Sequence, residues 1–345
     1  MSQTQRITHI DSLRGMAVIL MVMVHAAATW NPFQEQQHSV LAYVVSGLGG
    51  LAAPLFVTLF GWGIVRSRLT LKQIIFQATF LFSAQILVNL TSPHLFNPFT
   101  PGILSLMGLV TIISPSITHL IKAYGIRPLM ITSVLIFTIQ NLFPELQGVG
   151  QWSDRVNDET PSIILSNLFF TGTYPLFPWI TFVVLGATIS SYYSSQGTKL
   201  PSTYFTKTAL GFGLLFCSTT FFYSQYTGVL WAHPTADAYL TFFPANTAFI
   251  TAAFTGVVLI WYLIQFYEFH FLNGTGKISL TIYLVHFIPL SIMHQYDEKY
   301  QWGLTMSSVI VLLYTFAWIP ISIIWLKYWP RANLETILRG IRKSL

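Results

Sequence analysis

Long apolar segments follow one another along almost the whole of this 345-residue chain, and they constrain its fold more than any other feature. Only 8% of the residues are charged, against about 25% in soluble domains. Ten segments approach the ~20 residues needed to cross the hydrocarbon layer of a membrane. They are residues 14–30, 41–65, 73–90, 101–120, 128–143, 174–192, 206–223, 244–266, 276–294 and 304–327. We therefore expect an all-α fold, a polytopic membrane bundle of about ten transmembrane helices.

The basic residues divide between the two sides that this succession of helices defines. With the N-terminus in the cytoplasm, all of the 17 lysines and arginines except Arg155 and Lys299 fall on the cytoplasmic side. Lys and Arg in short loops favour that side of a membrane. We therefore expect both termini to be cytoplasmic. The same segregation argues against a nucleic-acid-binding patch, although the sequence pI is about 9.3.

The chain divides into a transmembrane domain of residues 1–329 and a cytoplasmic tail of residues 330–345. In the tail, four apolar residues share one face of a helix and basic residues lie among them. The apolar residues are Leu334, Ile337, Leu338 and Ile341. This pattern predicts a basic amphipathic helix on the inner leaflet. A frayed, solvated tail is the alternative.

The first apolar segment carries ionisable residues that a simple membrane anchor does not need. Asp11 and Arg14 are three residues apart, on one face of a helix. His25 lies eleven residues beyond Arg14, or about 16 Å along the helix axis, and His286 lies at a matching depth in the ninth segment. Ionisable groups in hydrocarbon are costly unless they are paired or hydrated. We interpret the two histidines as lining one polar cavity; alternatively, each bonds a backbone carbonyl or a hydroxyl.

Further candidate residues flank the apolar segments. His38 follows the first segment, with Glu35 three residues before it. A neutral imidazole there can act as a general base, although a solvated loop histidine would give the same pattern. On the inner side, Arg14 either pairs with Asp11 or remains available to an anionic ligand. Other bases there that could meet phosphates, and that topology alone also explains, are Arg66, Arg68, Lys72 and Lys277.

Cysteine chemistry is nearly absent from the sequence. Cys217 is the only cysteine, and it lies in an apolar run. An intrachain disulfide and a thiolate metal site are therefore excluded, and we expect no metal.

Four stretches in chain order carry a family resemblance. They are Arg6 with Asp11, Arg14 and Gly15; residues 53–57 through Gly61; residues 174–179 through Gly186; and residues 276–280 through Tyr283 and His286. They resemble the multipass transmembrane acyltransferases, above all the heparan-α-glucosaminide N-acetyltransferase family and its bacterial relatives. The acyltransferase-3 group is a more distant likeness.

The resemblance implies an enzyme that moves acetyl from cytoplasmic acetyl-CoA to a glycan hydroxyl or amine across the membrane. Arg14 and the neighbouring inner bases would then hold the CoA phosphates. His38 matches, within a couple of positions, the catalytic base of the glucosaminide enzymes. His25 instead matches a histidine late in the first helix of the acyltransferase-3 group. The base is thus His38 or His25, with His286 lining the cavity and Asp11 ordering the donor entrance.

The expected function is that of an acyl-CoA-dependent membrane acyltransferase in a bacterial inner membrane. Its partners would be acyl-CoA, a glycan or amino-sugar acceptor, membrane lipid and, by analogy, a second copy of the chain; nucleic acid is not among them. The alternative is a proton-coupled transporter or exporter of a small or lipid-linked solute, because embedded His, Asp and Arg also serve proton coupling. Dependence on acyl-CoA separates the two functions.

Overall fold

The computed structural model describes residues 7–30, 40–148, 150–192, 199–200, 202–235, 237–267, 269–300 and 302–345. The first half comprises α1 (Thr8–Trp30), α2 (Val40–Gly49), α3 (Ala52–Arg66), α4 (Leu71–Thr91), α5 (Ile103–Tyr124), α6 (Arg127–Leu142), η1 (Pro144–Gln147), α7 (Trp152–Val156), α8 (Pro161–Ser166) and η2 (Asn167–Thr171). The second half comprises α9 (Leu176–Tyr192), α10 (Tyr204–Thr227), β1 (Leu230–His233), β2 (Ala238–Thr241), α11 (Thr247–Tyr267), η3 (His270–Leu272), α12 (Asn273–Lys277), α13 (Ser279–Val285), α14 (Phe287–Tyr300), α15 (Leu304–Tyr328) and α16 (Leu334–Ser344).

Helices occur at each of the ten predicted positions, and the chain is an integral membrane protein. Six of the described helices are long and apolar enough to cross a membrane: α1, residues Gly47–Arg66, α4, α5, α11 and α15. Two bent pairs raise the number to eight if each is one span. They join Pro161–Thr171 to Leu176–Ser191 at 44° and His270–Lys277 to Ser279–Tyr296 at 66°. The count of ten spans, which would also need α6 and α10, stays a prediction, as does the cytoplasmic placement of both termini.

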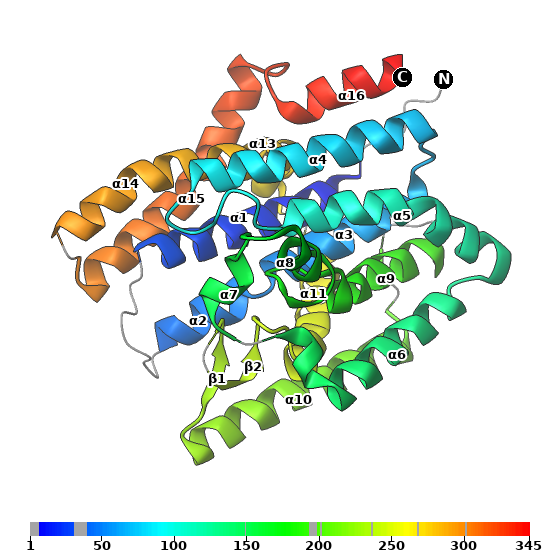
Figure 1. The fold of residues 1–345 in the computed structure, drawn as a ribbon, viewed down its shortest axis with the longest axis horizontal. Coiled ribbons are helices and arrows are strands. Elements are labelled where there is room, and N and C mark those ends of the chain that lie inside the picture. The colour runs from blue at the N-terminus through cyan, green and yellow to red at the C-terminus, as the bar shows by residue number, and fades with distance from the viewer. Residues whose placement is uncertain are drawn as a thin grey trace.

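Helix α1 is the centre of the bundle. It contacts α2, α3 and α11 to α15, and in Figure 1 it crosses the middle of the molecule in dark blue. Its apolar residues are buried on all sides, including Val18, Val22 and Ala26. A helix that is apolar all round belongs inside a bundle or a membrane, so the first apolar segment of the sequence becomes the best enclosed helix of the fold.

Two helix crossings are so close that only glycine fits. A Cβ atom at Gly276 of α12 would collide with the carbonyl oxygen of Asp11 in α1. Similarly, a Cβ atom at Gly186 of α9 would collide with the carbonyl oxygen of Thr58 in α3. Small residues let helix backbones approach in membranes. The first crossing brings Lys277 beside the start of α1. The second fixes the position of α3, which lines the cavity described below.

The structure departs from uniform long helices in three places. The predicted helix 41–65 is divided between α2 and α3, and the predicted helix 276–294 is divided among α12, α13 and α14. The break between α13 and α14 falls at His286, and Pro289 lies in the first turn of α14, where a proline is readily accommodated. The otherwise helical fold also contains a short parallel pair, in which β1 pairs with β2 and Leu230 lies opposite Ala238.

The predicted tail helix is present as α16. It begins at Asn333, whose side-chain oxygen caps the helix by accepting a hydrogen bond from the amide of Thr336 at 2.9 Å. In Figure 1, α16 runs alongside α4. Ile337 and Ile341 are exposed, whereas Leu334 and Leu338 are partly buried against the bundle. The helix is therefore confirmed, and its contact with an inner leaflet remains a prediction.

Candidate active site

Two histidines from distant parts of the chain meet in the bundle. Nδ1 of His25 lies 2.9 Å from Nε2 of His286, and the two rings are stacked with their centroids 5.2 Å apart. His286 is fully buried. The prediction that the two histidines share one location is confirmed.

The hydrogen bonds of His286 determine which nitrogen of each ring carries a proton. Nδ1 of His286 lies 3.0 Å from the carbonyl oxygen of Ile282, and because a carbonyl can only accept, that nitrogen donates. In the neutral ring, Nε2 of His286 then accepts the hydrogen bond from Nδ1–H of His25. It follows that Nε2 of His25 carries the lone pair and is the basic nitrogen of the pair.

Aromatic residues hold the histidine pair. The hydroxyl of Tyr314 donates to the carbonyl oxygen of His286 at 2.5 Å. The ring of Tyr283 stands edge-on to His286, with the centroids 6.0 Å apart, and the ring of Phe287 lies 4.7 Å from His25. These contacts surround the pair with aromatic rings, and a hydrogen bond in such low-dielectric surroundings is stronger than in water.

At the N-terminal end of α1, Asp11 and Arg14 form the predicted ion pair. Nη1 of Arg14 lies 3.5 Å from Oδ1 of Asp11. The carboxylate is almost fully buried, whereas the side chain of Arg14 is 38% exposed. Asp11 therefore holds a cation that still faces outward, toward the cavity described next.

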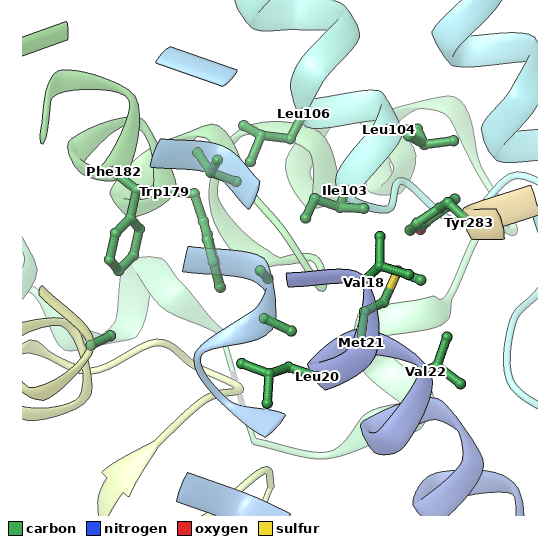
Figure 2. Packing of buried hydrophobic residues seen from close by; sticks show 14 of the residues in the cluster. Val18, Leu20, Met21, Val22, Ile103, Leu104, Leu106, Trp179, Phe182 and Tyr283 are labelled. Atoms are coloured by element: carbon green, nitrogen blue, oxygen red, sulfur yellow. The ribbon is translucent and has the colours of Figure 1, made fainter. Parts of the chain in front are cut away.

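A cavity of about 470 Å³ lies beside this end of α1 and reaches Tyr283. Its rim carries Arg14, Lys277, Glu335, Arg339 and Arg342. Its walls are apolar and come from α3, α4 and α5, with residues such as Phe56, Phe80 and Met107. Figure 2 shows Ile103, Leu104 and Tyr283, three further wall residues, grouped next to Val18 and Met21 of α1. Because Tyr283 also contacts His286, one side chain separates the cavity from the histidine pair.

The catalytic-domain model of heparan-alpha-glucosaminide N-acetyltransferase matches residues 6–223, well over half of the chain. The chain belongs to this family. No curated protein matches it. Membership in the heparan-alpha-glucosaminide N-acetyltransferase family indicates an acetyltransferase; the more distant likeness to the acyltransferase-3 group stays a prediction.

The matched segment contains only part of the site in this heparan-alpha-glucosaminide N-acetyltransferase family member. Asp11, Arg14 and His25 lie inside it, together with α3, α4 and α5. His286, Tyr283, Lys277 and all of α16 lie beyond residue 223. The structure therefore completes the site with residues that the family match does not reach.

The predicted inner bases do not all reach the cavity. Lys277 lies on its rim with Arg14. Arg66 instead places its guanidinium 4.8 Å from the ring centroid of Trp62, and Arg68 and Lys72 are exposed, outside the described lining. The predicted sixth helix, α9, packs against α3 and contributes no residue to that lining. His38 lies outside the described residues.

Sequence reasoning missed two features near the site. The first is the pair Arg339 and Arg342 on the cavity rim, which the sequence indicated only as basic residues of an amphipathic tail. The second is His94, whose ring stacks on that of His294 with the centroids 4.4 Å apart. Nε2 of His94 lies 3.2 Å from Oγ1 of Thr29, one helical turn beyond His25 on α1. Burial, and then the neighbouring His294, lowers the pKa of His94 to about 4.

Among the described residues, no group of three or more His, Cys, Asp or Glu side chains is arranged to hold a metal ion. The four histidines above form two separate stacked pairs.

Proposed function

We propose that this protein transfers an acetyl group from acetyl-CoA on the cytoplasmic side of the membrane to an amino sugar or glycan on the other side. The observation that carries the proposal is the cavity, which runs from a cationic rim to Tyr283 beside the His25–His286 pair. The family match supports acetyl transfer, and the donor, the acceptor and the direction are our inferences.

The cavity suits acyl-CoA in its chemistry. Arg14 and Lys277 on the rim offer charge-assisted hydrogen bonds to phosphates, and Asp11 orients Arg14 at 3.5 Å. The apolar walls suit the less polar arm that ends in the thioester. The segregation of Lys and Arg favours a cytoplasmic position for this rim, on the side where acyl-CoA is available. The acetyl end would then lie near Tyr283.

His25 is the proposed general base. Nε2 of His25 accepts a proton from the acceptor amine or hydroxyl as the acceptor atom bonds to the thioester carbonyl carbon. The carbon–sulfur bond breaks, and the same proton passes to the departing thiolate, so that the products are the acetylated acceptor and CoA thiol. His286 is a positioning residue, because its Nε2 fixes the proton of His25 on Nδ1 and supports the cation formed in between.

Donor binding is tested on the purified full chain in detergent by thermal shift with acetyl-CoA. At 100 times the dissociation constant the ligand should stabilise the protein by about 2.7 kcal/mol, and Arg14→Ala should lose most of that shift. Arg68→Ala, which removes an exposed cation outside the cavity lining, is the matched control and should retain it. No shift with CoA or acetyl-CoA at millimolar concentration would overturn the proposal and favour the transporter.

The base is tested by acetyl transfer to glucosamine. His25→Gln should lower kcat by about 10²–10⁴-fold, the usual contribution of a general base, with little change in the KM for acetyl-CoA. His286→Phe, which removes the acceptor for Nδ1–H, should lower kcat more than His286→Gln, whose amide oxygen can replace it. Loss of activity in His38→Gln with full activity in His25→Gln would assign the base to His38 instead.

A further inference from the structure

We propose that helix α16 is a donor clamp, in which Arg339 and Arg342 bind the phosphate groups at the nucleotide end of the acyl donor. The proposal rests on the function proposed above. It concerns residues beyond 223, where the family match ends. The tail thus becomes part of the binding site.

One end of the donor clamp is fixed to α13. Oε1 of Glu335 accepts hydrogen bonds from the amides of Leu280 and Thr281 at 2.6 and 3.3 Å. Oε2 accepts a third bond from the Thr281 hydroxyl at 2.7 Å. The amide of Leu334 donates to that same hydroxyl at 2.9 Å. Because its carboxylate is engaged by α13, Glu335 lies on the rim as an anchor rather than as a competing anion.

The other end of the donor clamp is fixed to α4. Nη1 of Arg342 donates to Oε1 of Gln77 at 3.0 Å, and Nε2 of Gln73 donates to the carbonyl oxygen of Arg342 at 2.8 Å. A guanidinium group has five N–H donors, so the bond to Gln77 leaves others for a ligand. The helix therefore spans the cavity mouth between two fixed ends.

The residues between these anchors face the cavity. Leu338 and Arg339 both line it, and they lie four and three residues before Arg342, about one helical turn from the second anchor. Arg339 is exposed and Arg342 is half-buried. With Arg14 and Lys277 opposite, they bring four cations to the rim of one cavity. Several phosphates on one ligand match such a cluster, because arginine forks bind phosphate oxygens with two parallel hydrogen bonds.

Two sources could supply phosphate to this cluster, the donor's nucleotide end or anionic lipid headgroups. The apolar cavity beneath the cations favours the donor, because the cavity provides a place for the rest of the same molecule. The test therefore compares acetyl-CoA with acetyl-pantetheine, a thioester that lacks the nucleotide. It is run once in lipid-free detergent and once in nanodiscs with and without phosphatidylglycerol.

We expect Arg339→Ala and Arg342→Ala each to raise the KM or Kd for acetyl-CoA about tenfold or more. The KM for acetyl-pantetheine should change less than twofold, and the effect should be equal with and without anionic lipid. Lys343→Ala removes an exposed cation from the same helix outside the described cavity lining, and it should leave both donors unaffected. Glu335→Ala should weaken acetyl-CoA binding as well and should accelerate amide hydrogen exchange in α16, whereas Arg339→Ala, which removes no anchor, should leave that exchange unchanged.

Wild-type protein that binds CoA, with Arg339→Ala and Arg342→Ala variants that bind it equally well, would overturn the donor clamp and leave the proposed function standing. Effects of these variants that appear only with phosphatidylglycerol would assign the cations to lipid and also overturn it. Equal losses for acetyl-CoA and acetyl-pantetheine would show that the two arginines do not act through the nucleotide phosphates, and would also overturn the donor clamp. Wild-type protein that binds neither donor would refute the proposed function itself.

Discussion

In the contact between His25 and His286, a hydrogen bond made by one ring determines which nitrogen of the other ring carries the proton. A carbonyl oxygen can only accept, so Ile282 fixes the proton on His286, and His286 then fixes the proton on His25. The basic nitrogen is thereby turned away from its partner. A lone histidine in a helix would leave this choice open, which is why residue type and depth alone do not identify a general base.

His94 makes the stability of the protein depend on pH. In the folded protein, burial and the stacked ring of His294 lower the pKa of His94 to about 4, from 6.5 for an exposed histidine. Between these pH values the unfolded chain binds a proton that the folded protein does not. Stability should therefore be unaffected above pH 6.5, fall as the pH is lowered toward 4, and change little from this source below that.

Between pH 7 and pH 4, we expect wild type to lose about 1–2 kcal/mol more of its free energy of unfolding than the His94→Gln variant loses. This figure allows for the partial exposure of the ring. The measurement is the melting temperature of both proteins across that range. His119→Gln, at an exposed position near the end of α5, serves as the control. Parallel curves for wild type and His94→Gln would show that His94 is protonated equally in the folded and unfolded states.

The helices of the bundle are positioned by close crossings as much as by their apolar faces. Helix α9 packs so tightly on α3 that a Cβ atom at Gly186 would collide with the backbone at Thr58. Its contribution to the site is indirect, because it supports the helix that carries Phe56 and Phe60 into the cavity wall. The proline- and glycine-containing stretch that carried the family resemblance here is therefore architectural.

Gly186→Ala should destabilise the protein by about 1–3 kcal/mol, because the added methyl group must separate two helices that are in backbone contact. Thermal unfolding of the purified variant measures the effect. Gly211→Ala in α10, where a Cβ atom would meet nothing within 4 Å, is the matched control and should be neutral or slightly stabilising. Equal melting temperatures for the Gly186→Ala variant and wild type would contradict the crossing.

The orientation of the entire bundle underlies both proposals, since a donor cavity must open where acyl-CoA is found. The cavity rim and the tail helix α16 lie at the end of the molecule where α1 begins. The 3₁₀ helix η1, which follows α6, lies on the side that the charge pattern predicts to be the exterior. The proposed transfer therefore requires Lys343 to face the cytoplasm and Glu145 to face outward. Both residues are exposed.

This orientation is measurable with single cysteines, because Cys217 is the only native one. In a Cys217→Ser background, an impermeant maleimide should label Glu145→Cys in intact cells and label Lys343→Cys only after permeabilisation. Labelling of both sites after permeabilisation provides the control for accessibility. The reverse pattern in intact cells would place the cavity on the outer side and exclude cytoplasmic acyl-CoA as its ligand.

The amino-acid sequence alone was enough to predict a helical membrane protein, the approximate positions of its helices and the shared depth of His25 and His286. These features follow from local composition, because the thickness of the hydrocarbon layer sets the length of each apolar segment. The four stretches that begin with the motif around Asp11 and Arg14 together indicated the family, which the family match confirms. The breaks within the ninth predicted helix were harder to predict from the sequence, because they depend on how the neighbouring helices pack around the bend.

Which residues share the site depends instead on contacts between segments that are far apart in the chain. Arg342 meets Gln77 across 265 positions of sequence, and His94 meets His294 through the packing of a loop on α14. Apolar periodicity says which face of a helix is buried but not which neighbour buries it. The rim arginines therefore resembled a surface tail in the sequence, and became part of a cavity only when α16 was anchored to α4 and α13.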